Sequence, residues 1–215
     1  MSTLLLTEDE TMLQDAARGF LDGAAPVSHF RKLRDAGQTH DAKLWAEMAQ
    51  MGWTGVLVPE DAGGSDMGHA AAGVLAGELG KTLVTSPFIS TAVIAATALR
   101  QVATDRARDA LASIAAGDVI YGLAVDEGAK HDPDATQLEA RADGNGFRLS
   151  GTKGFVVDGG NADRLLVLAK TDAGLTLFDL PADRDGITRT GQNMVDARDA
   201  AQVTFDNVQA TGDDV

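Results

Sequence analysis

The spacing of apolar residues changes character near Gly117, and this change limits the chain to folds in which a helical half precedes a β half. Before Gly117, apolar side chains recur at the period of an amphipathic helix. The first such stripe follows Thr7 and Glu10, whose spacing is that of a capping box at a helix start. We therefore predict an all-α domain over residues 1–117, with further helices at residues 44–51, about 66–79, from 86 onward and 104–116.

After this point, apolar runs become short and alternate with polar residues, while glycine, aspartate and asparagine recur between them. Such spacing is typical of a small antiparallel barrel or sandwich. We predict a β domain over residues 118–215, whose strands include residues 120–125, 147–149, 155–157, 165–169, 175–180 and 202–205. The predicted fold class is α+β, an N-terminal all-α helical domain followed by a small antiparallel β-barrel or sandwich domain.

Composition excludes several classes of protein. The 215 residues carry a formal net charge of −14, with the acidic residues scattered, so nucleic acid and anionic membranes are poor partners. The chain has no cysteine, which excludes disulfides, thiolate nucleophiles and cysteine-based metal sites. Its N-terminus lacks the basic stretch of a signal peptide, and the longest apolar segment, residues 87–99, is too short to span a bilayer. We expect a cytoplasmic protein without a membrane span.

Familiar catalytic patterns are missing from the sequence. The four histidines lie far apart and none pairs with a carboxylate at a metal-binding spacing, so we predict no metal site. The carboxylates within residues 126–134 lack the order of an EF-hand loop. Ser65 and Ser150 lie outside a G-x-S-x-G pattern, and the glycine pairs lack phosphate-loop spacing. No residue of this chain is assigned a catalytic role.

The most informative segment is residues 146–170, GFRLSGTKGFVVDGGNADRLLVLAK. Alternation around Phe147 leads into a glycine-rich turn, and a second extended run starts at Phe155. Glycine-hinged strands that carry an aromatic side chain offer backbone amides and one flat face to a planar ligand. On the residues alone, an ordinary structural hairpin is the favoured interpretation.

This segment resembles the middle-domain signature of the acyl-CoA dehydrogenase family, G-x-K-x-[WF]-[IV]-[TS]-[ND]-G followed by an apolar strand. Other segments resemble the family in the same order: the opening helix at residues 7–21, the block LWAEMAQMGWTGVLVPEDAGG at 44–64, the helix end at 77–80 and the late strand at 201–208. The resemblance covers the whole chain in several independent blocks. Family members continue into a C-terminal helical bundle, which we expect to be absent from this chain because it stops at Val215.

The resemblance implies FAD as the cofactor and an acyl-CoA thioester as the substrate. Carried over residue by residue, the family's flavin contacts fall on Leu123, Val125, Asp126, Phe155, Val156 and Val157. Glu127 keeps the family's residue, and Asp132 falls in the segment that approaches the substrate. The family has side-chain hydroxyls where this chain has Asp126 and Val157. Val157 loses a hydrogen bond worth about 0.5–1.5 kcal/mol, and a carboxylate at Asp126 would oppose the negative charge of a reduced flavin.

In the family's reaction, a carboxylate removes the α-proton of the acyl-CoA while a hydride leaves the β-carbon for the flavin. That carboxylate comes from the C-terminal helical domain, so we expect this chain alone to be inactive, and we expect Glu78 to have a packing or salt-bridge role. The leading hypothesis is an acyl-CoA dehydrogenase-like oxidoreductase of fatty acid or lipid metabolism, acting on CH–CH groups and forming homo- or hetero-oligomers with similar subunits.

Two alternatives remain open. One is a catalytically silent partner subunit of a heteromeric acyl-CoA dehydrogenase, which the lost hydroxyls at Asp126 and Val157 motivate. The other is a flavin monooxygenase or oxidase of the same fold, because a fold does not determine its chemistry.

Overall fold

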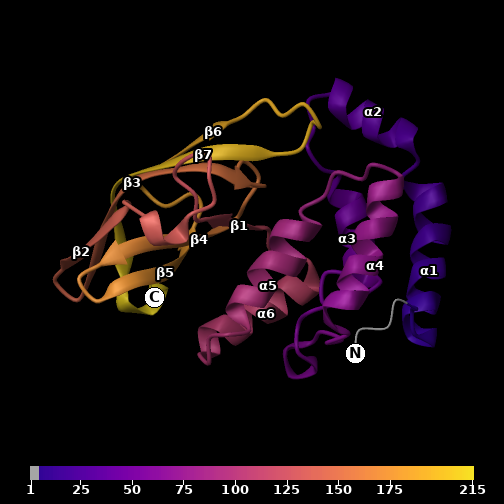
Figure 1. The fold of residues 1–215 in the computed structure, drawn as a ribbon, viewed down its shortest axis with the longest axis horizontal. Coiled ribbons are helices and arrows are strands. Elements are labelled where there is room, and N and C mark those ends of the chain that lie inside the picture. Colours follow the sequence, from indigo (N-terminus) through magenta and orange to yellow (C-terminus); the bar gives the residue numbers. More distant parts are fainter. Residues whose placement is uncertain (1–4) are drawn as a thin grey trace. The chain divides into compact units, whose positions relative to one another are not determined.

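The computed structural model describes residues 5–215, which form two compact units that divide between Asp118 and Val119. The first unit is helical, and the second is built on one sheet (Figure 1). This order of elements confirms the predicted α+β class. Among the described residues, no helix combines the length and the apolar character needed to cross a membrane.

The helical unit starts and ends as its local sequence predicts. At the N-terminus of the first helix, Thr7 Oγ1 accepts a hydrogen bond from the Glu10 amide at 3.1 Å, and Glu10 Oε2 accepts one from the Thr7 amide at 2.8 Å. The last helix is closed by Gly117, whose φ of 76° is easily adopted only by glycine. The helices are α1 (Glu8–Ala24), α2 (Val27–Asp35), α3 (Ala42–Gln50), η1 (Glu60–Ala62), α4 (Gly68–Lys81), η2 (Phe88–Ala95), α5 (Ala96–Leu99) and α6 (Asp105–Ala116).

The segment η2 is a π-helix, which leads directly into the α-helical turn α5. The helix predicted from residue 86 onward therefore exists but begins with wider winding than predicted. Nearly all residues of η2 are apolar or small, so the spacing of its apolar side chains does not distinguish the two kinds of helix.

Polar contacts connect helices that are distant in the sequence. Glu78 on α4 has a side chain only 2% exposed, and it pairs with Lys81 at 2.7 Å and with Arg18 of α1 at 3.3 Å. Helices α1 and α4 lie side by side (Figure 1). The salt-bridge role expected for Glu78 is confirmed. In the same unit, Trp45 Nε1 donates to the Gly117 carbonyl at 3.0 Å and so joins α3 to the end of α6.

The second unit is a seven-stranded mixed sheet with the order β1-β4-β2-β3-β7-β6, and β5 pairs with β4 outside this path. Its strands are β1 (Tyr121–Ala124), β2 (Glu139–Asp143), β3 (Gly146–Val157), β4 (Arg164–Thr171), β5 (Gly174–Pro181), β6 (Ile187–Gly191) and β7 (Ala200–Thr211). The β4–β5 pair is a hairpin, as the turn residues between the predicted strands 165–169 and 175–180 indicate. The hairpin expected to turn at residues 151–154 is wrong, because β3 continues through these residues and pairs there with β7. Glycines inside a strand also mark bulges and close backbone approaches, and the β2–β3 hairpin was not predicted.

The sheet differs from the predicted antiparallel arrangement in two pairings, because β4 runs parallel to both β1 and β2. Sequence spacing indicates which neighbouring strands form hairpins, whereas β1 and β4 are separated by two other strands. The core of the unit lies on the inner faces of these strands, where Leu149, Val167 and Phe205 are almost completely buried. Phe147 packs edge-on against Phe178, with ring centroids 5.3 Å apart.

Candidate functional site

A β-bulge in β3 places an aromatic side chain on the surface of the sheet unit. Lys153 pairs with Val203 of β7 and Val156 pairs with Ala201, so three steps along β3 match two along β7. Phe155 lies within this bulge with a φ of 53° and is 50% exposed. A left-handed backbone costs a non-glycine residue about 1–2 kcal/mol. An aromatic residue that is both strained and half-exposed indicates a binding surface more than a packing role.

The loop that follows β1 is hydrogen-bonded to this bulge. The Gly154 amide donates to the Asp126 carbonyl at 2.7 Å instead of joining the ladder with β7. Lys153, one residue earlier, donates its Nζ to the Val125 carbonyl at 2.8 Å and to Glu127 Oε1 at 2.8 Å. Two consecutive residues of β3 therefore hold three consecutive residues of the loop.

Glu127 connects the same loop to the start of β2. Its Oε1 accepts from the Leu138 amide at 2.8 Å, and its Oε2 accepts from the Gln137 amide at 2.8 Å. Burial pushes the pKa of Glu127 upward, but the hydrogen bonds from Lys153 and from the two amides outweigh this effect and hold the pKa below its ordinary value. Burial lowers the pKa of Lys153, and Glu127 offsets only part of that decrease. The two groups have the geometry of an ion pair, with Lys153 Nζ 2.8 Å from Glu127 Oε1.

Asp126 has a histidine partner of its own. Its carboxylate lies 3.0 Å and 3.2 Å from Nδ1 of His131, with the Asp126 side chain 28% exposed and that of His131 73% exposed. When His131 is protonated, the negative charge of Asp126 is therefore compensated locally. Such an exposed pair contributes about 0–1 kcal/mol to stability, so its main effect is on the local field.

The structure brings most of the sequence-predicted cofactor residues to this corner. Val125 and Asp126 lie at the end of β1 against the bulge that carries Phe155, while Leu123 and Val157 are half-buried on β1 and β3. The side chain of Val156 is completely buried in the core, so Val156 can offer a ligand only its main chain. Contact of these residues with a cofactor stays a prediction.

Asp132, the residue predicted to approach the substrate, lies farther along the same loop. It precedes the short helix η3 (Pro133–Ala135) and is exposed to solvent. A hollow of about 240 Å³ lies within the loop, and Asp132 lines it together with Val125, Glu127, Lys130 and Thr136, among others. This hollow is smaller than most ligand pockets, so it represents only part of a site formed by the loop and the bulge.

Sequence reasoning missed the ion pair between Lys153 and Glu127. These residues are 26 positions apart, and no local pattern joins them. One signal is present in the sequence: Lys153 lies between glycines and apolar residues in a strand whose alternate side chains face inward. A lysine at an inward position requires a buried acceptor or anion.

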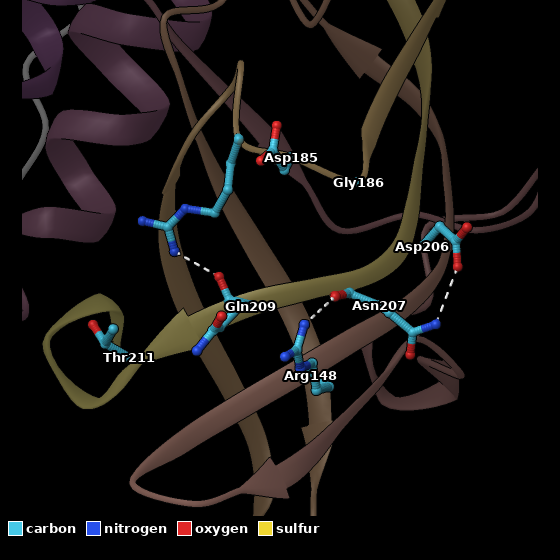
Figure 2. Close-up of a pocket in the computed structure, with 8 residues that line it drawn as sticks. Arg148, Asp185, Gly186, Asp206, Asn207, Gln209 and Thr211 are labelled. Carbon is cyan, nitrogen blue, oxygen red and sulfur yellow. Dashed lines mark hydrogen bonds between the residues drawn. The ribbon is translucent and has the colours of Figure 1, made fainter.

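A second hollow, of about 540 Å³, lies near the end of β7 and has two arginines in its lining (Figure 2). Arg148 donates to the Asn207 carbonyl at 3.1 Å and to Asp143 at 2.7 Å. Arg184 donates to the Gln209 carbonyl at 2.9 Å and pairs with Asp214. Both guanidinium groups are thus engaged within the chain.

Carboxylates also line this second hollow, since Asp185 and Asp206 contribute to it. Negative charge there disfavours phosphate or carboxylate ligands. The corner formed by the bulge of β3 and the loop after β1 is therefore the better candidate site. Among the described residues, no cluster of histidine, aspartate or glutamate side chains has an arrangement that could hold a metal ion.

Comparison with known proteins identifies relatives for both units. The model of the acyl-CoA dehydrogenase N-terminal domain matches residues 7–118. Acyl-CoA dehydrogenase FadE27 of Mycobacterium tuberculosis is 30% identical over 171 residues, which cover 79% of this chain and 45% of that protein. Acyl-CoA dehydrogenase FadE12 of the same species is 28% identical over 99% of this chain and 57% of its own length. The chain spans about half the length of the curated relatives that it matches.

Solved structures share the fold across nearly the whole chain. A variant of the Tcur3481-Tcur3483 steroid ACAD is 33% identical, with a TM-score of 0.86, over 95% of this chain and 56% of its own. The ChsE4-ChsE5 complex from Mycobacterium tuberculosis contains a chain that is 25% identical, with a TM-score of 0.90, over 99% of this chain and 58% of its own.

Proposed function

Because the chain belongs to the acyl-CoA dehydrogenase family, we propose that it forms the FAD-binding and acyl-CoA-binding part of a flavoprotein that oxidises the Cα–Cβ bond of an acyl-CoA thioester. The observation that carries this proposal is the bulge of β3, which presents the strained, half-exposed ring of Phe155 beside the loop after β1. Strand pairing alone does not require an aromatic residue that is both strained and exposed. A planar ligand requires such an arrangement, since it needs a flat apolar surface and a fixed edge.

The residues at this corner fit a flavin ring. Phe155 supplies an aromatic face, and the half-buried side chains of Leu123 and Val157 supply apolar surface at its margins. The main chain at Val125 and Asp126 supplies polar groups in a fixed position, because β3 holds both carbonyls. FAD bound there supplies the hydride acceptor of the reaction.

The residues of this chain then have binding and orienting tasks. The loop that carries Asp132 lies next to the cofactor residues, so we assign it to the acyl-CoA side of the site. Exclusion of water strengthens every electrostatic interaction at such a site. We assign the removal of the α-proton to a carboxylate outside residues 1–215, because the resemblance places the family's base in a C-terminal helical domain and this chain covers only 45% and 57% of two of its relatives.

The carboxylate of Asp126 does not rule out flavin reduction. An isolated negative charge at the ring would oppose the charge of the reduced cofactor. His131 lies within hydrogen-bond distance of that carboxylate, so the pair is neutral overall when the imidazole is protonated.

A spectroscopic titration of the full-length protein tests the proposal. We expect near-stoichiometric FAD after purification or reconstitution, and bleaching of its visible absorption when an acyl-CoA is added without oxygen. A protein that stays free of flavin after reconstitution would contradict the proposal. Turnover that requires oxygen and a substrate other than a CoA ester would instead identify a monooxygenase or oxidase.

A second candidate function is that of a silent partner in an unequal pair of subunits. Two observations favour it: Asp126 and Val157 replace the hydroxyls expected near the flavin, and two of the similar structures are named as two-component assemblies. Light scattering combined with flavin quantification separates the candidates. One flavin per heteromeric pair, bound by the other subunit, supports the silent partner, whereas one flavin per copy of this chain excludes it. A cytoplasmic location stays a prediction for both candidates.

A further inference from the structure

Lys153 is the most deeply buried charged side chain at the candidate site. Its side chain is 0% exposed, and it lies between the bulge of β3 and the loop after β1. The ammonium donates to the Val125 carbonyl and to Glu127 Oε1, both at 2.8 Å. One cation therefore fixes two points of the loop on either side of Asp126.

Stability alone does not account for this arrangement. Removing an ammonium and a carboxylate from water costs several kcal/mol per ion, and buried ion pairs can often be replaced by apolar residues at no loss of stability. What an ion pair provides and an apolar contact does not is a defined direction and distance. Here the direction fixes the loop relative to the bulge.

The contacts of Glu127 extend the same restraint to the far end of the loop. Its two carboxylate oxygens hold the amides of Gln137 and Leu138 at 2.8 Å, so residues 125–138 are closed at both ends. The residues between them include His131, which contacts Asp126, and Asp132, which we assign to the acyl-CoA side of the site. Loss of the ammonium would leave the loop at residues 125–138 attached to β3 by the hydrogen bond from the Gly154 amide to the Asp126 carbonyl.

We propose that Lys153 is a positioning residue, whose ion pair with Glu127 holds the loop at residues 125–138 in the geometry that binds the flavin beside Phe155. This inference rests on the proposed function. It assigns Lys153 no contact with the cofactor. Its effect passes through Glu127 and through the Val125 carbonyl, and small displacements of such supports are known to weaken a site strongly.

The test compares Lys153→Met with Lys170→Met in the full-length protein, and Glu127→Gln serves as the second variant of the pair. Methionine conserves the length of the lysine side chain and removes its charge. Lys170 is exposed on β4 and its amide donates to the Leu138 carbonyl, so it is a matched control close to the loop. Two readouts are measured: hydrogen exchange of residues 125–138 without flavin, and affinity and visible absorption with FAD.

We expect Lys153→Met to speed exchange of residues 125–138 and to weaken FAD binding by about tenfold or more, with the absorption bands of the remaining bound FAD shifted toward those of free FAD. Glu127→Gln should change both readouts in the same direction, and Lys170→Met should change neither. Exchange in the β4–β5 hairpin, residues 164–181, should stay as in the wild type.

Three results would overturn the inference. Unchanged FAD affinity and spectrum in Lys153→Met would show that Lys153 only stabilises the fold, even if hydrogen exchange became faster. Faster exchange across the whole sheet unit would show general destabilisation. A wild-type protein that binds no FAD would refute the proposed function as well, and this failure is recognisable because it appears before any substitution is made.

Discussion

Gly64 occupies a position where no side chain fits, and replacing it with alanine should destabilise the helical unit. A Cβ atom added at Gly64 would lie 2.0 Å from the Val58 carbonyl oxygen and 2.5 Å from the Val58 Cβ. Ordinary contact begins at 3.4 Å, so the two chain segments would have to separate by 3.4 − 2.0, or about 1.4 Å. Both segments are backbone and cannot swing away as a flexible side chain would.

Hydrogen bonds on either side of Gly64 resist this separation. The Gly64 amide donates to the Pro59 carbonyl at 3.0 Å, and the Asp66 amide donates to the same Val58 carbonyl at 3.1 Å. Overpacking of this kind costs typically 1–3 kcal/mol and occasionally more. Because the obstacle is backbone held by hydrogen bonds, we expect Gly64→Ala to reduce the free energy of unfolding by about 3 kcal/mol.

Tryptophan fluorescence is the appropriate assay, since both tryptophans of the chain, Trp45 and Trp53, are buried in the helical unit. For a protein of this size, a loss of about 3 kcal/mol lowers Tm by about 6–12 °C. Gly73→Ala is the matched control, because a Cβ at Gly73 in α4 meets nothing within 4 Å. Gly73→Ala should raise the free energy of unfolding by about 0.5–1 kcal/mol. Equal melting temperatures for the two variants would refute the steric argument.

The remaining predictions concern the sheet unit. Burial raises the pKa of Asp214, but Arg184 and the Thr211 amide outweigh this effect and lower the pKa from 3.8 to about 2. This carboxylate should therefore contribute about 2 kcal/mol to the free energy of unfolding above pH 4. That contribution should be lost as pH falls from about 4 to about 2. Urea unfolding of the wild type and Asp214→Asn at several pH values measures the loss. Val157→Thr should restore a hydroxyl beside the flavin and tighten FAD binding by about 2–10-fold in a fluorescence titration. Phe155→Ala should weaken FAD binding by a similar factor, because the aromatic face is lost.

Each of these predictions has its own control. A stability difference between the wild type and Asp214→Asn that persists unchanged at pH 2 would mean that the carboxylate is not the titrating group. Unchanged FAD affinity in Val157→Thr would show that this side chain does not face the ring. For Phe155→Ala, the control is Leu175→Ala, an exposed apolar residue of β5 that is 44% exposed. Equal FAD affinity in these two alanine variants would remove Phe155 from the site.

The candidate site was predictable only in part. Val125, Asp126 and Phe155 were identified by resemblance, and the structure places them together at the bulge of β3. Val156 was also predicted, but its side chain belongs to the core. Lys153 was not assigned a role, because its partner Glu127 lies 26 residues away and charge pairing at that distance leaves no periodic signal.

Local physics explains what the amino-acid sequence determined by itself. The capping box at Thr7, the glycine end of the last helix at Gly117 and the β4–β5 hairpin depend on residues a few positions apart, so their signals are contained in short segments. The α+β class follows from the same signals, because it requires only the order of helical and extended periodicities.

Tertiary structure alone decided the features that depend on distant partners. The parallel pairing of β1 with β4, the bulge that exposes Phe155 and the burial of Lys153 beside Glu127 all arise when segments separated by tens of residues meet. Their energies come from desolvation, register and backbone geometry, which exist only once the sheet has formed. The candidate site is built from these long-range contacts, and for that reason its geometry belongs to the folded chain.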